Sequence, residues 1–313
     1  MSQDETSLMK VLSAEPLPIL PRDDDPSSSN WRRQLYAFLR AIPKHFTPDN
    51  VQAAAGLVPS YSIHGNGSTT TKIDPGYLGT LATDITSGTE IFSVEFWFRE
   101  SPSMSSGELH TVFGWHDNST GGLFKCFIEA SSSTARHIEI NINRASTTRV
   151  YSNSGNTWTQ DHDWHHVVIQ VDVGSRTSEI YLDGVSKTTN ETSGAVTANS
   201  WTTFTTDPFL LFNMTAGLGS LTGTARVAMD EMVIYSGYNW TAAEALHHYH
   251  AGRSNKESYK YFILNHSAAK NSIVAYWGFD NKSGEPNVED SSGNGHTGVL
   301  TAGSSLVQYP GIF

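Results

Sequence analysis

Histidines and acids gather at two places in the sequence, and either group could in principle hold a metal ion. The first is residues 161–166, DHDWHH. Adjacent strand residues point to opposite faces, so its neighbouring histidines cannot ligate one ion, and one of them is expected to be hydrogen-bonded in or near the core. The second, residues 247–250, lies at the end of a short predicted helix. A zinc site on His247 and His250 stays open there, although cations also suit a helix C-terminus for structural reasons.

Paired carboxylates are the other candidate chemistry, because hydrolysis of a glycosidic bond uses two of them across a cleft. Glu95 and Glu100 are the nearest pair on a predicted strand. Their spacing places them on opposite faces, and both are expected at the surface. No glycine-rich stretch has a phosphate-binding spacing, and no Ser-His-Asp arrangement is evident in the sequence. The sequence therefore predicts a protein that is not an enzyme.

The stretch 164–184, WHHVVIQVDVGSRTSEIYLDG, is the clearest structural signal. Val167, Ile169 and Val171 alternate with other residues before a Gly-Ser-Arg-Thr turn, and Ile180 and Leu182 alternate after it. A period of two on both sides of a turn predicts an antiparallel hairpin with one buried face. The Asp-Gly pair that ends the stretch predicts a second tight turn.

Composition places this hairpin in an all-β protein. The chain has 313 residues, a net charge of −11 and one cysteine, Cys126, which is expected to be a buried, inert thiol. The acidic charge argues against nucleic-acid partners, and no apolar run reaches transmembrane length. Short alternating runs between Ser, Gly and Asn turns are typical of a two-sheet antiparallel sandwich. Further strands are predicted over 61–67, 92–98, 111–115, 122–128, 137–142, 149–151, 209–212 and 229–235.

The first 56 residues are predicted to form an arm ahead of a sandwich that spans 57–313. Prolines between 16 and 21 favour an extended path, and a basic amphipathic helix is predicted over 30–42. Two alternatives stay open, a tail and helix that serve only their own chain, or an arm that orders on a partner. The residues expected to anchor the arm are Leu17, Ile19, Leu20, Trp31, Arg32, Arg33, Leu35, Phe38, Leu39 and Arg40.

The hairpin sequence resembles the laminin G-like, concanavalin A-like jelly-roll family. Three more segments resemble motifs of that family, FSVEFWF at 92–98, MDEMVIY at 229–235 and WTAAEAL at 240–246. The resemblance covers about residues 60–252 and implies a jelly roll without specifying a reaction. Related glycan hydrolases carry Glu-x-Asp-x-x-Glu on one strand, a pattern that this sequence lacks.

The last part of the chain resembles the family's N-terminal signature, displaced to the end. Residues 273–280 read IVAYWGFD, and 288–296 contain DSSGNG. Too few residues follow for a second core, so 262–313 is expected to complete the same sandwich. A DSSGNG tail after the helix also resembles jelly-roll proteins of tailed phages.

The family resemblance suggests calcium as the one candidate cofactor. Some relatives hold Ca²⁺ near the rim with an aspartate of the "DE" strand, which corresponds to Asp230. Asp74, Asp280 and Asp290 are candidate companions, since Ca²⁺ prefers oxygen ligands. His64 stands where the family has an aspartate, which weakens the match. The alternative is that Asp230 hydrogen-bonds loop backbone.

Aromatic residues are the candidates for sugar contact. Trp115, Trp158, Trp201 and Trp240 are expected in or beside loops, where exposed rings could stack on glycans. The alternative is that most of them pack in the core or at its rim.

These observations predict a non-enzymatic structural or adhesion protein of a virus particle, of the tailed-phage kind. The start MSQDETSLMK lacks the layout of a secretory signal, although the fold type is usually extracellular. The expected location is the virion, and the expected partners are other virion proteins, further copies of the chain and cell-surface glycans, with no nucleic acid and no membrane. The alternatives are a soluble bacterial lectin module and a glycan-cleaving enzyme.

Overall fold

The computed structural model describes residues 61–64, 72–79, 81, 91–100, 105–116, 123–130, 132, 135–144, 148–153, 158–159, 161, 163–172, 175, 177–193, 209–212, 227–253, 256–280, 287–300 and 309–310. The chain divides into two units, Met1–Pro59 and Ser60–Phe313. The predicted arm, its helix and its anchoring residues lie outside the described residues.

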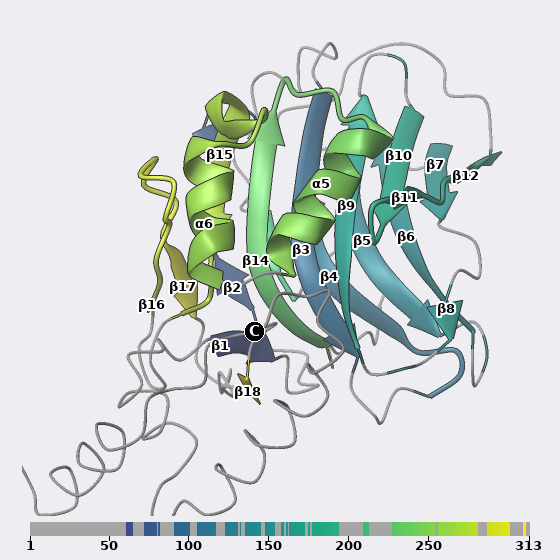
Figure 1. Ribbon diagram of the computed structural model, residues 1–313. Helices are drawn as coiled ribbons and strands as arrows, with labels where there is room; N and C mark the ends of the chain where they lie inside the picture. The colour runs from purple at the N-terminus through teal and green to yellow at the C-terminus, as the bar shows by residue number, and fades with distance from the viewer. Residues whose placement is uncertain are drawn as a thin grey trace, which may run out of the picture. The chain divides into compact units, whose positions relative to one another are not determined.

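Two antiparallel sheets make up the sandwich (Figure 1). The first sheet has the order β11-β10-β9-β3-β14-β1-β18, and β15 also pairs with β14. Its strands are β1 (Tyr61–His64), β3 (Ile91–Glu100), β9 (Trp164–Asp172), β10 (Thr177–Leu182), β11 (Val185–Ser186), β14 (Val227–Ser236), β15 (Ile273–Trp277) and β18 (Tyr309–Pro310).

The second sheet has the order β12-β7-β6-β5-β4-β13-β2-β17-β16, and β8 pairs with β6. Its strands are β2 (Ile73–Asp74), β4 (Leu109–His116), β5 (Leu123–Ala130), β6 (Ala135–Arg144), β7 (Thr148–Asn153), β8 (Trp158–Thr159), β12 (Thr189–Ser193), β13 (Phe209–Leu211), β16 (Asn287–Val288) and β17 (Gly298–Leu300). The predicted fold class, a two-sheet antiparallel sandwich, is confirmed.

The inner faces of the two sheets enclose the main core. In the central hairpin Ile169 lies opposite Ile180, and both belong to this core, as the alternation predicted. Cys126 is also buried in it, and burial raises the pKa of its thiol well above the ordinary value. The predicted tight turn is confirmed at Asp183 and Gly184, whose φ angles of 51° and 75° suit a type I′ hairpin.

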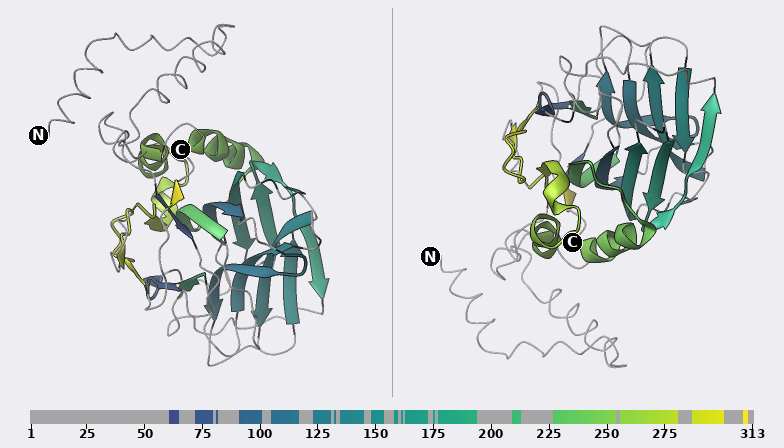
Figure 2. Two further views of the ribbon diagram at one scale, coloured as in Figure 1. Left: turned by 90° about the horizontal axis from the view of Figure 1, so that it is seen from below. Right: turned by 90° about the horizontal axis from the view of Figure 1, so that it is seen from above.

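A second core covers the outer face of the first sheet. Helices α5 (Ala242–Gly252) and α6 (Lys256–Asn265) lie over this face, and the short helix η1 (Lys270–Ser272) follows (Figures 1 and 2). Val168 and Tyr181 of the central hairpin are buried here with Tyr259 of α6. The prediction of one buried face for the hairpin is therefore wrong, because helices cover its other face. Neither helix of the described chain has the length and apolarity to cross a membrane.

Local sequence explains how α5 begins and why it packs so closely. Thr241 and Glu244 form a capping box at its N-terminus, each side chain bonding the other's backbone N–H. At its C-terminal end, a Cβ on Gly252 would lie 2.4 Å from Cζ2 of Trp97. Only glycine allows this approach without displacing the helix from β3.

The C-terminal segment completes both sheets, which confirms the prediction that it closes the sandwich. β15 extends the first sheet beside β14, while β16 and β17 extend the second beside β2. The DSSGNG turn is organised by Asp290, whose Oδ1 accepts the N–H groups of Tyr276 and Ser292 and whose Oδ2 accepts that of His296. The motif is thus a structural turn that fixes β15 against the following loop.

Candidate functional site

A buried carboxylate lies at the centre of the second core. Glu95 on β3 is fully buried, although the sequence analysis expected it at the surface. Its Oε1 lies 2.7 Å from Nε2 of His166 and 2.9 Å from Nδ1 of His248. The hydroxyls of Tyr235 and Tyr259 donate to it, each at 2.5 Å. β9, β14, α5 and α6 therefore all meet β3 at this one side chain.

The electrostatics of this network favour an ionised Glu95. Burial alone would raise the pKa of the carboxyl group, but the charge of His248 and the hydrogen bonds from His166 and His248 bring it far below its ordinary value of 4.5. Burial and the nearby Glu95 charge raise the pKa of both tyrosines well above 10, so they remain donors. The predicted structural role for one histidine of 165–166 is confirmed by His166.

Glu100 lies on the opposite face of β3, as the spacing predicted, but it too is buried and not at the surface. Its carboxylate accepts from Arg136 Nε of β6 at 2.8 Å and from Trp158 Nε1 of β8 at 2.6 Å. The two glutamates therefore stabilise different cores. Neither faces a cleft in which it could act on a substrate with the other.

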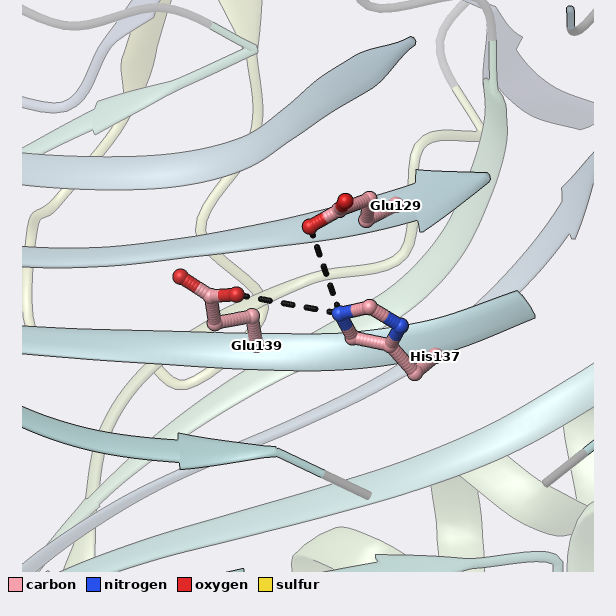
Figure 3. A group of neighbouring side chains, drawn as sticks. All are labelled: Glu129, His137 and Glu139. Carbon is pink, nitrogen blue, oxygen red and sulfur yellow. Dashed lines mark ion pairs between the residues drawn. The ribbon is translucent and has the colours of Figure 1, made fainter. Parts of the chain in front are cut away.

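A second histidine–carboxylate cluster lies on the outer face of the second sheet (Figure 3). His137 and Glu139 are on β6, and Glu129 is on β5 directly opposite His137. Nε2 of His137 is 3.3 Å from a Glu129 oxygen and 3.7 Å from a Glu139 oxygen. The potential metal-ligand atoms of these three side chains all lie within 4.8 Å of one another. Within the part of the chain that the structure describes, no other group of three or more His, Cys, Asp or Glu side chains meets this condition.

Strand alternation explains why these three side chains share a face. Ile128 and Ile138 point into the main core, so their neighbours Glu129 and His137 point outward. Lys125 lies on the same outer face of β5, and its Nζ is 4.9 Å from the centre of the Phe127 ring. The sequence analysis missed this cluster. The available signal was Glu129 and His137 on either side of a Ser-rich turn between two alternating strands.

The aspartates predicted to bind calcium do not converge in the structure. Asp230 is fully buried on β14 of the first sheet, where its Oδ1 accepts the N–H of Glu231. Asp74 lies on β2 of the second sheet and caps a turn through the N–H of Gly76. Asp290 holds the DSSGNG turn, and Asp280 follows β15. Asp230 does bond a backbone N–H, as its alternative proposed, but that N–H belongs to the same strand and not to a loop.

The tryptophans predicted to contact glycans are mostly buried. Trp115 is on β4, not in a loop, and is 1% exposed in the main core. Trp240 is 4% exposed and packs edge-on against His248. Trp158 is half-buried and held by Glu100, and Trp201 lies outside the described residues. Trp115 and Trp240 thus present no open ring face to a ligand.

The remaining histidines that the sequence singled out lie on β9 and on α5. His165 is bound by two carboxylates, with Nδ1 2.8 Å from Asp183 and Nε2 3.2 Å from Asp161. Burial lowers the pKa of its imidazole, but the two carboxylates outweigh burial and raise it. His247 and His250 are exposed on α5. A separate pocket, at the edge of the first sheet, is lined by Gln170, Thr177, Ser178, Glu179 and Tyr181.

Comparison with known proteins identifies the family. The profile described as the concanavalin A-like lectin/glucanases superfamily matches residues 75–244, more than half of the chain. The chain belongs to this superfamily. No curated protein sequence matches it.

Solved structures are similar only at low identity. A protein from Bacteroides ovatus described as carbohydrate-binding is 13% identical with a TM-score of 0.47, and the match covers 78% of this chain and 58% of that one. A serum-amyloid-P-like pentraxin from Limulus polyphemus is 8% identical with a TM-score of 0.42, covering 60% and 81%. A structure of botulinum neurotoxin type C is 13% identical with a TM-score of 0.37, covering 54% and 37%.

Proposed function

We propose that this chain is a glycan-binding module without hydrolytic activity, and that the outer face of the second sheet is its binding surface. The observation that carries the proposal is the strip of polar side chains on β5 and β6, where Glu129 and His137 are partly exposed beside the buried side chains of Lys125, Phe127 and Glu139. Sugar hydroxyls bind to fixed hydrogen-bonding groups of this kind, and the pairing of β5 with β6 holds Glu129 opposite His137. Membership of a superfamily described as lectins and glucanases supports a carbohydrate as the ligand.

Binding is favoured over hydrolysis by the positions of the carboxylates. Hydrolysis needs an acid and a second carboxylate that flank the scissile bond. Glu95 and Glu100 are bound within separate cores. Glu129 and Glu139 do come together, but both approach one nitrogen of His137 from the same sheet face. That leaves the trio as a surface for recognition and gives no pair of carboxylates on two sides of a sugar.

The test is a glycan array probed with the full-length chain. Each glycan that binds is then incubated with the chain in solution, and chromatography shows whether the glycan has been cleaved. We expect selective binding and intact glycans. Selective binding with released sugars would show hydrolytic activity and would contradict the proposal of a module that only binds. No binding to any glycan class would contradict the proposal.

For the biological setting, we propose a virion structural or adhesion protein of a tailed phage, attached through residues 1–56. One support is the DSSGNG tail, which follows the helices in an order that resembles phage jelly-roll proteins. The other is the arm itself, which contains apolar and basic residues that could attach it to a partner. The sandwich would then present its second sheet to host glycans. The alternative is a bacterial lectin in which residues 1–56 act only as a linker.

Mass spectrometry of purified particles separates these settings. Full-length protein should be present in particles, and a version lacking residues 1–50 should be absent from them. Incorporation of the shortened version would contradict an anchoring arm. A chain that never occurs in particles would favour the free lectin.

A further inference from the structure

We propose that Glu129, His137 and Glu139 form a binding site for one divalent transition-metal ion, with zinc as the representative ion. The site goes beyond the proposed glycan binding, because it can hold an ion whether or not the second sheet binds sugars.

The separations between these side chains match those between ligands of one ion better than those of a hydrogen bond. Both carboxylates approach the same atom, Nε2 of His137, at 3.3 and 3.7 Å. Good N–H···O distances are about 2.7–3.2 Å, and both of these separations are longer. Ligands bound about 2.0–2.2 Å from a tetrahedral ion lie about 3.4 Å from each other. Both observed separations are close to this value.

The third separation, between the two glutamates, is also compatible with an ion. Their nearest ligand atoms are within 4.8 Å. Glutamate side chains rotate readily, so a small movement of Glu129, which is 29% exposed, would complete the set. The backbone need not move, because β5 and β6 hold Glu129 opposite His137 and Glu139 two residues further along the same face.

His165 shows that composition alone does not make such a site. It too has two carboxylate partners, but Asp183 lies 2.8 Å from Nδ1 and Asp161 lies 3.2 Å from Nε2. Each ring nitrogen therefore has its own acceptor, which suits a protonated imidazole and leaves no nitrogen for an ion. In the trio, by contrast, both carboxylates compete for one nitrogen, and a single cation can bind all three side chains.

Ligand chemistry and accessibility define the kind of ion. Calcium takes six to eight oxygen ligands, whereas an imidazole with two carboxylates suits zinc and neighbouring transition metals. The side chains of His137 and Glu139 are 12% and 6% exposed, so the site is open on the Glu129 side and largely desolvated elsewhere. An ion could enter from that side and keep a coordination position for water or another oxygen ligand.

The test is calorimetric titration of the chelator-treated full-length chain with zinc chloride. We expect saturable binding of one ion per chain, and Co²⁺ should give the visible absorption of a coordinated ion. Glu129→Gln and His137→Gln should each weaken zinc binding by about tenfold or more, since even outer-shell changes cost about 10–100-fold. Glu179→Gln on the first sheet and His250→Gln on α5 are matched controls and should bind as the wild type does.

Several outcomes would overturn the proposal. These are no saturable zinc binding, unchanged affinity in both trio variants, or a loss in His250→Gln, which would place the ion on α5. Calcium binding as tight as zinc would contradict the assigned ion class. Circular dichroism of each variant establishes that it is folded, and Glu129→Gln, at the exposed edge, tests the site even if His137→Gln does not fold.

Discussion

The outer faces of the two sheets each carry a cluster of histidines and carboxylates. The cluster on the first sheet has more histidines than carboxylates, whereas the cluster on the second sheet has more carboxylates than histidines. On the first sheet, two histidines and two tyrosines surround the single carboxylate of Glu95, and helices α5 and α6 cover them. On the second sheet, two carboxylates share one nitrogen of His137 at a partly exposed position. In the first cluster hydrogen bonds satisfy the charge within the protein. In the second, Glu129 and Glu139 share the imidazole of His137, and Lys125 lies on the same sheet face.

This difference separates a structural cluster from a functional one better than residue type does. A buried carboxylate with four donors stabilises the elements that supply them, and no further ligand can reach it. A partly exposed carboxylate beside a histidine on a rigid sheet, such as Glu129, can still accept a cation or the hydroxyls of a sugar. Substitutions of the same kind in each cluster should therefore have opposite consequences for stability and binding.

The largest effect is expected for Glu95→Gln. The amide keeps the shape but replaces a charged acceptor of four donors by a neutral group that must itself donate. Removing one partner of a buried, hydrogen-bonded charge network costs about 3–5 kcal/mol. Urea unfolding at pH 7 measures the change in the free energy of unfolding. A decrease of less than about 1 kcal/mol in the free energy of unfolding would show that the network does not stabilise the helices on the first sheet.

Gly252→Ala tests the helical cover of that sheet directly. A Cβ at this position would lie 2.4 Å from Trp97, so α5 must shift, and overpacking costs about 1–3 kcal/mol. Tryptophan fluorescence and urea unfolding report the change. The control is Ala243→Gly on the exposed side of the same helix, which should cost about 1 kcal/mol through helix propensity alone. Stabilisation by Gly252→Ala would contradict close packing of α5.

A smaller effect with a distinct pH dependence is expected for His165→Asn. The carboxylates of Asp183 and Asp161 raise the pKa of His165, so the folded state binds its proton more tightly than the unfolded state. Its contribution to stability is complete below the ordinary value of 6.5 and is lost as the pH rises through the raised value. The stability difference between wild type and variant should therefore narrow from pH 6 to pH 9. A difference that widens over this range would contradict the assigned ion pairs.

The Glu95 network should show the opposite pH dependence. The pKa of the Glu95 carboxyl group is lower in the folded state than in the unfolded state. The stability that ionised Glu95 contributes is therefore complete above the ordinary pKa of 4.5 and is lost as the pH falls towards the lowered pKa. The stability gap between wild type and Glu95→Gln, measured by urea unfolding, should be constant from pH 7 to pH 5 and narrow in more acidic solution. A gap that widens on acidification would mean that Glu95 is not ionised in the fold.

The smallest stability effect is expected for Glu129→Gln. Its side chain is 29% exposed, and pairs at such positions contribute about 0–1 kcal/mol. Thermal unfolding of the metal-free variant measures this directly. A destabilisation as large as that of Glu95→Gln would show that the trio is a structural cluster like its counterpart on the first sheet.

Sequence reasoning predicted the sandwich well, because alternation marks strands that are buried on one face. It placed the β9–β10 hairpin, the turn at Asp183–Gly184 and the C-terminal closing segment correctly. It did not predict α6, although Tyr259, Phe262 and Ile263 have the spacing of a helical apolar face. Without α6, nothing in the sequence showed that the outer face of β3 would be covered, so Glu95 was expected at the surface.

The candidate site was harder to predict than the fold. Its three residues come together only through the register of β5 with β6, which sets Glu129 opposite His137. Register depends on turn geometry that a Ser-rich loop does not specify. Histidines adjacent in sequence drew attention first, yet His165 and His166 contact different partners on opposite faces of β9.

The most direct test of the account is the affinity of the full-length chain, Glu129→Gln and Glu179→Gln for the strongest glycan on the array. Both variants lose one carboxylate from an outer sheet face, and Glu179 also lines the pocket beside β9 and β10. If the second sheet is the binding surface, Glu129→Gln should weaken binding by about tenfold, as expected for one lost charged hydrogen bond of 1.5–3 kcal/mol, while Glu179→Gln binds normally. The reverse result would move the binding site to the first sheet and contradict the account.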